Sequence, residues 1–269
     1  GGQSPKLALA ALLAVPPGAA DAQACRETLD ALAEAAEVQD LFVVRAVARY
    51  LEHPDDLVRQ ATVQALARVA PREDEACIAE VAVFLGSGCE AVRRAALVAM
   101  RSMSELGSCA TVNAVVSFLR HRSVEVRLFA MDALPEVAEP GDAAVIAAVT
   151  PLLRDVYEDV RRAALTVLLR MCGTSDERAL RAVFDCLEDR SLPMQRMAAG
   201  AVSKLIQSGD TRAMDAVISR LAHPDDMVRQ QAIEVLTQVA GQGNVHAVEG
   251  IARLFQHRSV FVRRAAVQA

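Results

Sequence analysis

The residues in this 269-residue chain whose types could support binding or catalysis recur at one interval. Arginines stand 34 residues apart, interrupted once by Gln195: Arg59, Arg93, Arg127, Arg161, Arg229 and Arg263. Four of the five histidines follow the same interval: His53, His121, His223 and His257. Such an arginine column could form a ladder of ligand contacts, and histidines that meet in space could bind zinc.

The spacing favours a structural role for both columns. Equivalent residues of neighbouring units should lie roughly 10 Å or more apart, too far for one zinc ion, so the histidines are predicted to be turn residues. Acidic residues precede the arginines at helical spacing, as Asp56 precedes Arg59 and Asp226 precedes Arg229. This arrangement favours helix capping and ion pairing over ligand binding.

The remaining reactive residues do not form a catalytic pattern. Six cysteines occur without a C-x-x-C pair and are predicted to be free thiols in a reducing compartment: Cys25, Cys77, Cys89, Cys109, Cys172 and Cys186. Cys186 is expected in the core, and Cys89 in an exposed turn. We find no Gly-rich phosphate loop, paired-carboxylate motif or Ser-His-Asp arrangement in the sequence. We therefore expect no enzymatic activity, no cofactor and no metal.

The elements that must position these columns form a 34-residue repeat. Counted from Leu51, position 1 is Leu in six units, position 8 is mostly Val, and position 12 is Ala in all but one. Positions 8, 12, 16 and 19 lie at helical spacing and predict an amphipathic helix, which we name helix B. Positions 28 and 31 begin a second apolar stripe, helix A. Gly, Pro, Asp and Ser recur between the two, which indicates turns and caps.

These patterns predict an all-α protein, an α-solenoid or superhelix of about seven to eight two-helix repeats. The composition agrees, because 53% hydrophobic residues exclude disorder and only 3% aromatic residues argue against a β-sandwich or barrel. The predicted units are a degenerate one at 17–50, full ones at 51–84, 85–118, 119–152, 153–186, 187–220 and 221–254, and a partial one at 255–269.

The pattern D-x-x-V-R-x-x-A-x-x-A-L, seen from Asp55 to Leu66 and again from Glu90 to Ala96, resembles HEAT repeats. The closest likeness is to the short HEAT-like repeats of phycobilisome lyases and of many scaffold proteins; the tetratricopeptide signature is absent. The resemblance implies that the arginine column pairs with acids of its own or the next repeat. Gln195 interrupts that ladder, which leaves a local kink or a docking point as alternatives. HEAT-like hydroxylases bind iron through His-Glu pairs, and the sequence contains none.

The solvent side of helix B is the candidate partner-binding surface, because in HEAT-like solenoids it commonly lines the concave face. Positions 10, 14 and 18 form this surface, which we name the helix-B row. Basic residues outnumber acidic ones there, although the whole chain carries a net charge of −5. An ordinary solvated face is the alternative. The candidate residues are Gln60, Gln64, Arg68, Arg94, Arg162, Arg170, Arg196, Lys204, Gln230 and Arg264.

We therefore expect a non-catalytic scaffold or assembly subunit that binds proteins along the helix-B row and at its open ends. A bilin-lyase-like subunit is one alternative, although no residue carries that chemistry over. Nucleic-acid binding along the basic residues is another, disfavoured because there is no Trp and there are only two Tyr.

The expected location is intracellular, in the cytoplasm or an organelle interior. Lys6 and the apolar residues from Leu7 to Val15 outline a signal peptide, but the repeat register favours an ordinary helix there and makes secretion the lesser alternative. No run is apolar enough for a membrane span. The chain starts at Gly1 and stops at Ala269 within a helical pattern, so we expect it to be part of a longer chain.

Overall fold

A computed structural model describes residues 21–35, 41–171, 177–207, 211–240 and 245–269. Within these ranges the secondary structure is entirely helical, with turns between the helices, and the protein is an all-α solenoid. The chain divides into two compact units, residues 1–148 and 149–269. The expected helix or leader near residues 7–24 falls largely outside the described ranges.

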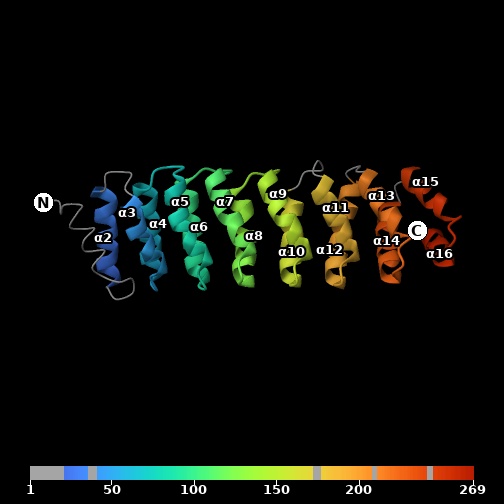
Figure 1. Ribbon diagram of the computed structural model, residues 1–269, viewed down its shortest axis with the longest axis horizontal. Coiled ribbons are helices and arrows are strands. Elements are labelled where there is room, and N and C mark those ends of the chain that lie inside the picture. The colour runs from blue at the N-terminus through green and yellow to red at the C-terminus, as the bar shows by residue number, and fades with distance from the viewer. Residues whose placement is uncertain (1–20, 36–40, 172–176, 208–210, 241–244) are drawn as a thin grey trace. The chain divides into compact units, whose positions relative to one another are not determined.

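The first unit is a series of helix pairs that follow one another in chain order (Figure 1). Its helices B pack on one another in sequence, α4 against both α2 and α6, and its helices A do the same, α5 against α3 and α7. A short 3-10 helix extends several of the helices A. The elements are α2 (Ala22–Ala35), α3 (Leu41–Ala48), η1 (Arg49–Glu52), α4 (Asp56–Val69), α5 (Glu75–Ala82), η2 (Val83–Gly86), α6 (Glu90–Met103), α7 (Cys109–Ser117), η3 (Phe118–Arg120), α8 (Val124–Val137) and α9 (Ala143–Val149).

The second unit repeats the arrangement. Here α12 packs on α10 and α14, and α14 packs on α16. Its elements are η4 (Thr150–Arg154), α10 (Glu158–Met171), α11 (Glu177–Asp185), η5 (Cys186–Glu188), α12 (Leu192–Gln207), α13 (Thr211–Arg220), α14 (Asp226–Ala240), α15 (Val245–Leu254) and α16 (Val260–Gln268).

The helices start at the same 34-residue interval as the sequence repeat. Each helix B starts 34 residues after the preceding one, from Ala22 in α2 to Val260 in α16, and each helix A does the same from Leu41 to Val245. The small residue at position 12 is buried in every described repeat from residue 51 onward; Ala96, Ala164 and Ala198 are each 0% exposed. A larger side chain there would push neighbouring helices apart, so the alanine column reflects close packing between repeats.

The B–A turns also tie neighbouring repeats together. Position 23 has a positive φ in three of them: 59° at Glu73, 83° at Gly107 and 89° at Gly141. In the first unit the backbone N–H of Glu73 donates to the carbonyl of Met103, and that of Gly107 to Val137. Glycine is the residue that tolerates this conformation, so Glu73 is the exception, and its side chain makes compensating contacts discussed below.

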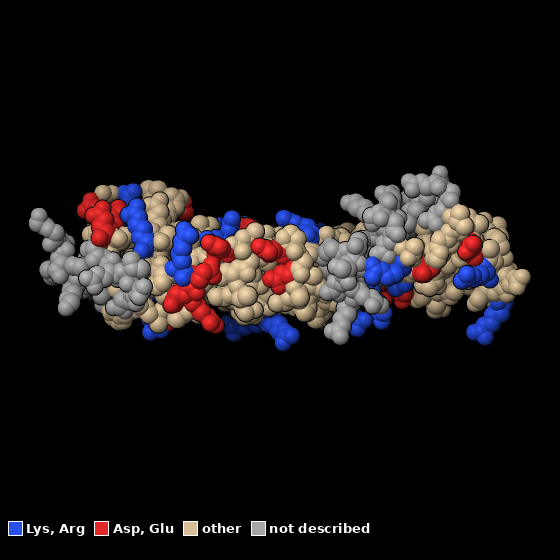
Figure 2. Space-filling model, turned by 90° about the horizontal axis from the view of Figure 1, so that it is seen from above, with Lys and Arg blue, Asp and Glu red and all other residues tan. Residues whose placement is uncertain are grey.

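The turn edge of the first unit is acidic. It faces the viewer in Figure 2, where Asp and Glu side chains gather over the region of α5 to α7. Glu73, Glu75 and Glu105 are exposed there. No helix in the described part of the chain is both long enough and apolar enough to cross a membrane.

Candidate functional site

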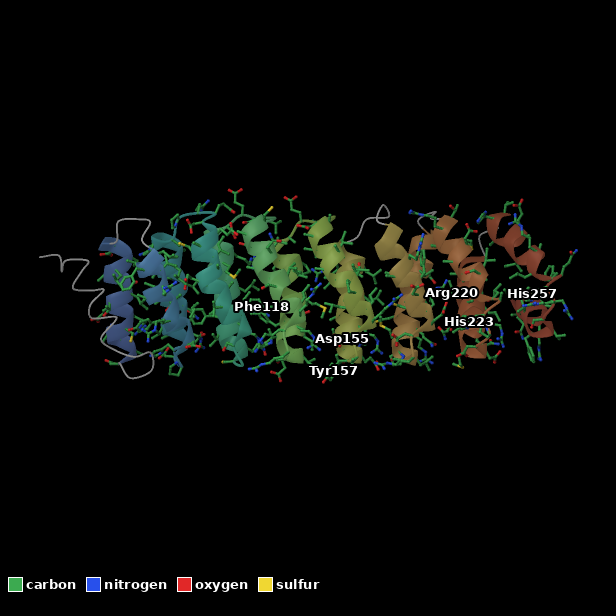
Figure 3. All side chains as sticks on the ribbon, viewed as in Figure 1. Phe118, Asp155, Tyr157, Arg220, His223 and His257 are labelled. Carbon is green, nitrogen blue, oxygen red and sulfur yellow. The ribbon has the colours of Figure 1, made fainter. Side chains whose placement is uncertain are left out.

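The A–B turns share one side-chain hydrogen bond. In each described repeat from residue 51 onward, the side chain at position 3 accepts a hydrogen bond from the backbone N–H two residues later. Four acceptors are the Nδ1 atoms of His53, His121, His223 and His257, at 3.0 to 3.1 Å. The others are oxygens of Ser87, Asp155 and Asp189. Figure 3 labels Asp155, His223 and His257 at these turns.

The histidines are therefore turn residues, as the spacing predicted. A ring nitrogen that accepts from the backbone carries no proton and is not available to a metal ion. Within the described residues, no group of three His, Cys, Asp or Glu side chains is arranged to hold a metal ion.

The column arginines form hydrogen bonds with the same A–B turns. Each guanidinium donates from Nη1 to the carbonyl of position 3, at 2.7 to 3.0 Å: Arg59, Arg93, Arg127, Arg161, Arg229 and Arg263. An acidic partner is less regular. Asp56 pairs with Arg59 at 2.9 Å and Asp226 with Arg229 at 2.6 Å. The contact common to the column is thus a carbonyl, because the side chain closes the turn that precedes its own helix.

Gln195 keeps this contact although it interrupts the column. Its Nε2 donates to the carbonyl of Asp189 at 2.6 Å, the position-3 carbonyl of its own repeat. The cation comes instead from the preceding repeat, because Arg161 bonds both carboxylate oxygens of Asp189, at 2.8 and 2.9 Å. The substitution is therefore matched by an ion pair between repeats, an arrangement that neither of the sequence-based alternatives foresaw.

The helix-B row is on the surface where the structure describes its side chains. In the first unit Gln60, Gln64, Arg68 and Arg94 are exposed. The charge there is partly neutralised, since Glu136 pairs with Arg94 at 3.1 Å and with Arg101 at 2.7 Å. Arg101 is at position 17, one residue before position 18 of the helix-B row, and was not among the predicted residues.

The row is more basic in the second unit. Arg162, Arg170, Arg196, Gln230 and Arg264 are exposed. Arg170 occupies the repeat position that Glu136 occupies one unit earlier, so the sign of the charge is reversed. Among the described residues of this unit, Arg162 has only a long contact to Asp159 at 3.8 Å, and Arg170 and Arg196 have no ion-pair partner. The side chain of Lys204 lies outside the described residues.

The sequence-based prediction missed an apolar row beside these arginines. It comprises the position-7 residues Leu57, Met227 and Phe261, which are 52%, 49% and 71% exposed, and the exposed Pro193. Position 7 lies one helical turn before position 10. The signal was present, since apolar residues stand at a position on the solvent side of helix B, but Ala91, Glu125 and Asp159 interrupt the column.

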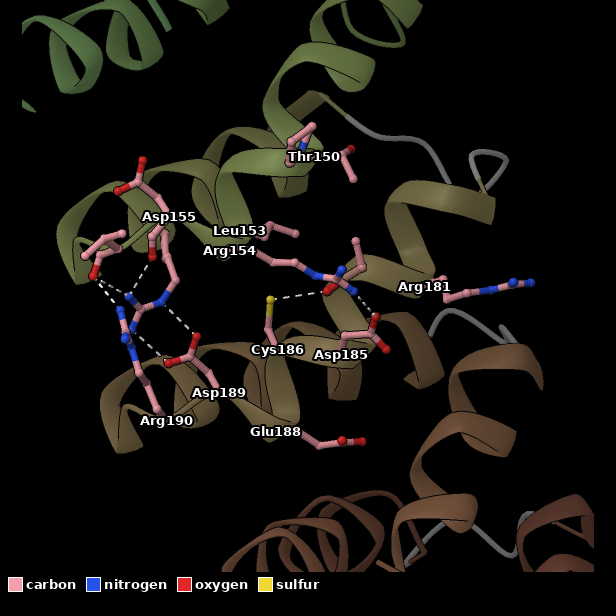
Figure 4. A pocket seen from close by; sticks show the side chains of 14 residues that line it. Thr150, Leu153, Arg154, Asp155, Arg181, Asp185, Cys186, Glu188, Asp189 and Arg190 are labelled. Carbon is pink, nitrogen blue, oxygen red and sulfur yellow. Dashed lines mark hydrogen bonds and ion pairs between the residues drawn. The ribbon is translucent and has the colours of Figure 1, made fainter. Parts of the chain in front are cut away.

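The second unit also contains a cavity of about 980 Å³ between η4 and α11 with η5 (Figure 4). Its charged walls are largely paired with one another. Arg154 extends toward Asp185 at 3.4 Å, and Arg161 pairs with Asp189 at 2.8 Å. Cys186 lies in the wall, where burial raises the pKa of its thiol to about 12. The thiol therefore stays protonated near neutral pH, and it is buried in the core as the sequence predicted.

A fold built from repeated pairs of antiparallel helices, with the same hydrogen-bonded A–B turn in successive repeats and an exposed helix-B row, defines a helical repeat protein. The HEAT-repeat family matches residues 81–169 and 146–237, more than half of the chain, and the chain belongs to that family. The hydrogen-bonded A–B turns and the buried alanines at position 12 form the structural framework of the repeats in this protein.

Two solved structures are similar over most of their length. Human deoxyhypusine hydroxylase in complex with glycerol is 15% identical, with a TM-score of 0.36, and the match covers 98% of this chain and 94% of that one. An archaeal HEAT-like repeats protein from Thermococcus onnurineus NA1 is 14% identical, with a TM-score of 0.41, and the match covers 90% and 98%. A comparison with curated proteins finds no match.

Proposed function

We propose that this chain is a non-catalytic scaffold that binds partner proteins along the helix-B row. The observation that carries the proposal is the repeated exposure of one side of helix B, from Gln60 in α4 to Arg264 in α16. HEAT repeats commonly mediate protein interactions, and a surface that recurs in each repeat can contact a partner at many points at once.

The chemistry of the interior supports binding rather than catalysis. Two ion pairs, Arg154 with Asp185 and Arg161 with Asp189, join charged groups of the large cavity to one another. The thiols of Cys77 and Cys186 are buried, and burial raises the pKa of each to about 12. Neither thiol is therefore suited to act as a nucleophile.

Site-specific photo-crosslinking tests the proposal. A photoreactive amino acid is placed at Gln64 or Arg170 on the helix-B row, and at Asn113 or Ser219 as exposed controls on helix A. The chain is then isolated with any protein that copurifies in a fixed ratio, and illuminated. We expect crosslinks from the row positions and few from the controls. Equal crosslinking from Asn113 and Ser219, or no protein held in a fixed ratio, would contradict the proposal.

A further inference from the structure

The helices B of the second unit present two parallel rows of different chemistry. The basic row consists of Arg162, Arg196 and Arg264 at position 10, where α14 has Gln230 instead. The apolar row consists of Pro193, Met227 and Phe261 at position 7, where α10 has Asp159 instead. All six side chains are exposed. Residues three apart on a helix have Cβ atoms about 5 to 6 Å apart, so the two rows lie side by side along successive helices.

The Phe261 ring of the apolar row packs against a buried arginine of the preceding repeat. The guanidinium carbon of Arg229 lies 5.8 Å from the centre of the Phe261 ring, in a cation–π contact between neighbouring repeats. Arg229 is itself 7% exposed and is fixed by hydrogen bonds to the carbonyls of His223 and Pro224, each 2.7 Å long. The exposed ring is thus supported by a rigid group, which lowers the entropy cost of using it as a binding contact.

Gly200 leaves open space beside the basic row. It lies inside α12, four residues after Arg196, and a Cβ built on it would meet nothing within 4 Å. A glycine inside a helix costs about 1 kcal/mol relative to alanine, and no contact within the described chain requires it here. A glycine at such a place permits the close approach of another backbone.

The charges are unevenly distributed over this face. Arg170 on α10 and Arg196 on α12 have no ion-pair partner in the described part of the chain, whereas α14 carries the exposed Glu234 at position 14. The apolar-row residues Met227 and Phe261, which are 49% and 71% exposed, lie on α14 and α16. Arg264 on α16 is also exposed, so the basic row continues beside Phe261.

We propose that this face binds an acidic amphipathic helix of a partner protein, with its carboxylates along the basic row and its apolar side chains along the apolar row. The inference rests on the proposed scaffold function and names the partner's chemistry. The arginines complement carboxylates, while the apolar row would gain nothing from a purely polar polyanion. Gly200 lies where the partner's backbone crosses α12.

The repeat spacing sets the periodicity expected of the partner. Packed helices lie about 8 to 10 Å apart, and a helix rises 1.5 Å per residue. A helix that crosses the repeats therefore advances by one repeat about every five to seven residues. Its contacting residues should recur at that interval.

A labelled peptide tests the proposal by fluorescence anisotropy. The probe is a helical peptide with Leu and Glu in a seven-residue repeat. The comparison probes are a scrambled peptide of the same composition, a peptide with Lys in place of Glu, and duplex DNA. We expect the acidic amphipathic peptide to bind at least about tenfold more tightly than each comparison probe.

Variants of the chain locate the binding. Arg162→Glu combined with Arg196→Glu should weaken binding of the acidic peptide by about tenfold or more, and Met227→Asp should also weaken it. The matched control combines Arg49→Glu with Arg120→Glu, two exposed arginines of the first unit that lie outside the helix-B row, and should change binding by less than about twofold. Circular dichroism verifies that each variant is folded.

Four results would overturn the inference: no binding of the acidic peptide, equal binding of the scrambled peptide, equal binding of duplex DNA, or equal loss in the control variant. Crosslinks from Gln64 to a native partner, found together with any of these, would leave the scaffold function standing while the acidic-helix inference fails. An absence of crosslinks from the whole helix-B row would remove the scaffold function itself.

Discussion

Arg161 in α10 forms a bidentate ion pair with Asp189, which precedes α12 in the next repeat. The two side chains are 4% and 9% exposed. Asp189 stands where four other repeats have histidine, and its own repeat has Gln195 where the others have arginine. The carboxylate at position 3 is thus paired with a cation from the preceding repeat, while position 9 of its own repeat supplies a neutral amide. The second unit gains a charged contact between repeats at this point.

Removal of Arg161 should therefore destabilise the chain strongly. We expect Arg161→Met to lower the free energy of unfolding by about 3 to 5 kcal/mol, because it leaves the Asp189 carboxylate buried without a counter-charge. Urea denaturation followed by circular dichroism measures the change.

The control for this substitution is Arg93→Met. Arg93 is 5% exposed and bonds the carbonyl of Ser87, and it has no carboxylate partner among the described residues. A smaller loss, about 1 to 2 kcal/mol, is expected there. Adding Asp189→His to Arg161→Met should recover part of the stability, because histidine accepts the turn hydrogen bond in four other repeats. Equal losses in Arg161→Met and Arg93→Met would contradict this account.

The contribution of Glu73 to stability should depend on pH. Hydrogen bonds from the Ser108 hydroxyl and the Glu105 backbone N–H lower the pKa of this carboxyl. A carboxyl with a lowered pKa in the folded state stabilises the fold above its ordinary pKa of about 4.3, and that stabilisation is lost as the pH falls through the folded value. The difference in unfolding free energy between the unmodified chain and Glu73→Gln should therefore shrink between about pH 6 and about pH 3.

Ser108→Ala provides the control for Glu73. It removes the donor with the largest effect on the pKa of Glu73, so the pH dependence assigned to Glu73 should become smaller in that background. Denaturant titrations at several pH values give both comparisons. A difference that stays constant with pH would show that the carboxyl is not stabilised by these bonds.

Two glycine substitutions should have opposite effects. Gly200→Ala should stabilise the chain by about 1 kcal/mol, because a Cβ meets open space in a helix interior. Gly107→Ala should destabilise it by about 1 to 2 kcal/mol, because φ is +83° and the Cβ would lie 3.1 Å from Cγ of Glu139. Thermal unfolding measures the change in stability of each variant. A change of the same sign in both variants would refute this interpretation.

The cysteines should differ in their rates of alkylation. Cys89 is exposed at the start of α6, where the backbone N–H groups of Val92 and Ala91 lower the pKa of its thiol. Cys77 and Cys186 are buried. We expect iodoacetamide to modify Cys89 before either buried thiol in the folded protein, as followed by peptide mass spectrometry. Cys172 lies outside the described residues and is replaced by Ser in every sample. Modification of Cys77 at the same rate as Cys89 would contradict the prediction.

The period of the sequence determined most of the fold. A helix can be recognised from its own stretch of sequence, through apolar residues at helical spacing and turn residues at its ends. A 34-residue repeat therefore defines the helix pairs without knowledge of distant contacts. The starts of α4, α6 and α8 follow that period, and the alanine at position 12 is buried as the pattern required. The role of the histidines as turn residues followed from the same spacing.

The partners of individual side chains were decided by the tertiary structure. The acceptor of each column arginine is a backbone carbonyl, which carries no mark in the sequence, and the pairing of Arg161 with Asp189 depends on how two successive repeats stack. The neutralisation of Arg94 and Arg101 by Glu136 is of the same kind. A local pattern fixes which side of a helix a residue occupies, whereas the distance between charges on neighbouring helices is set only when the helices pack.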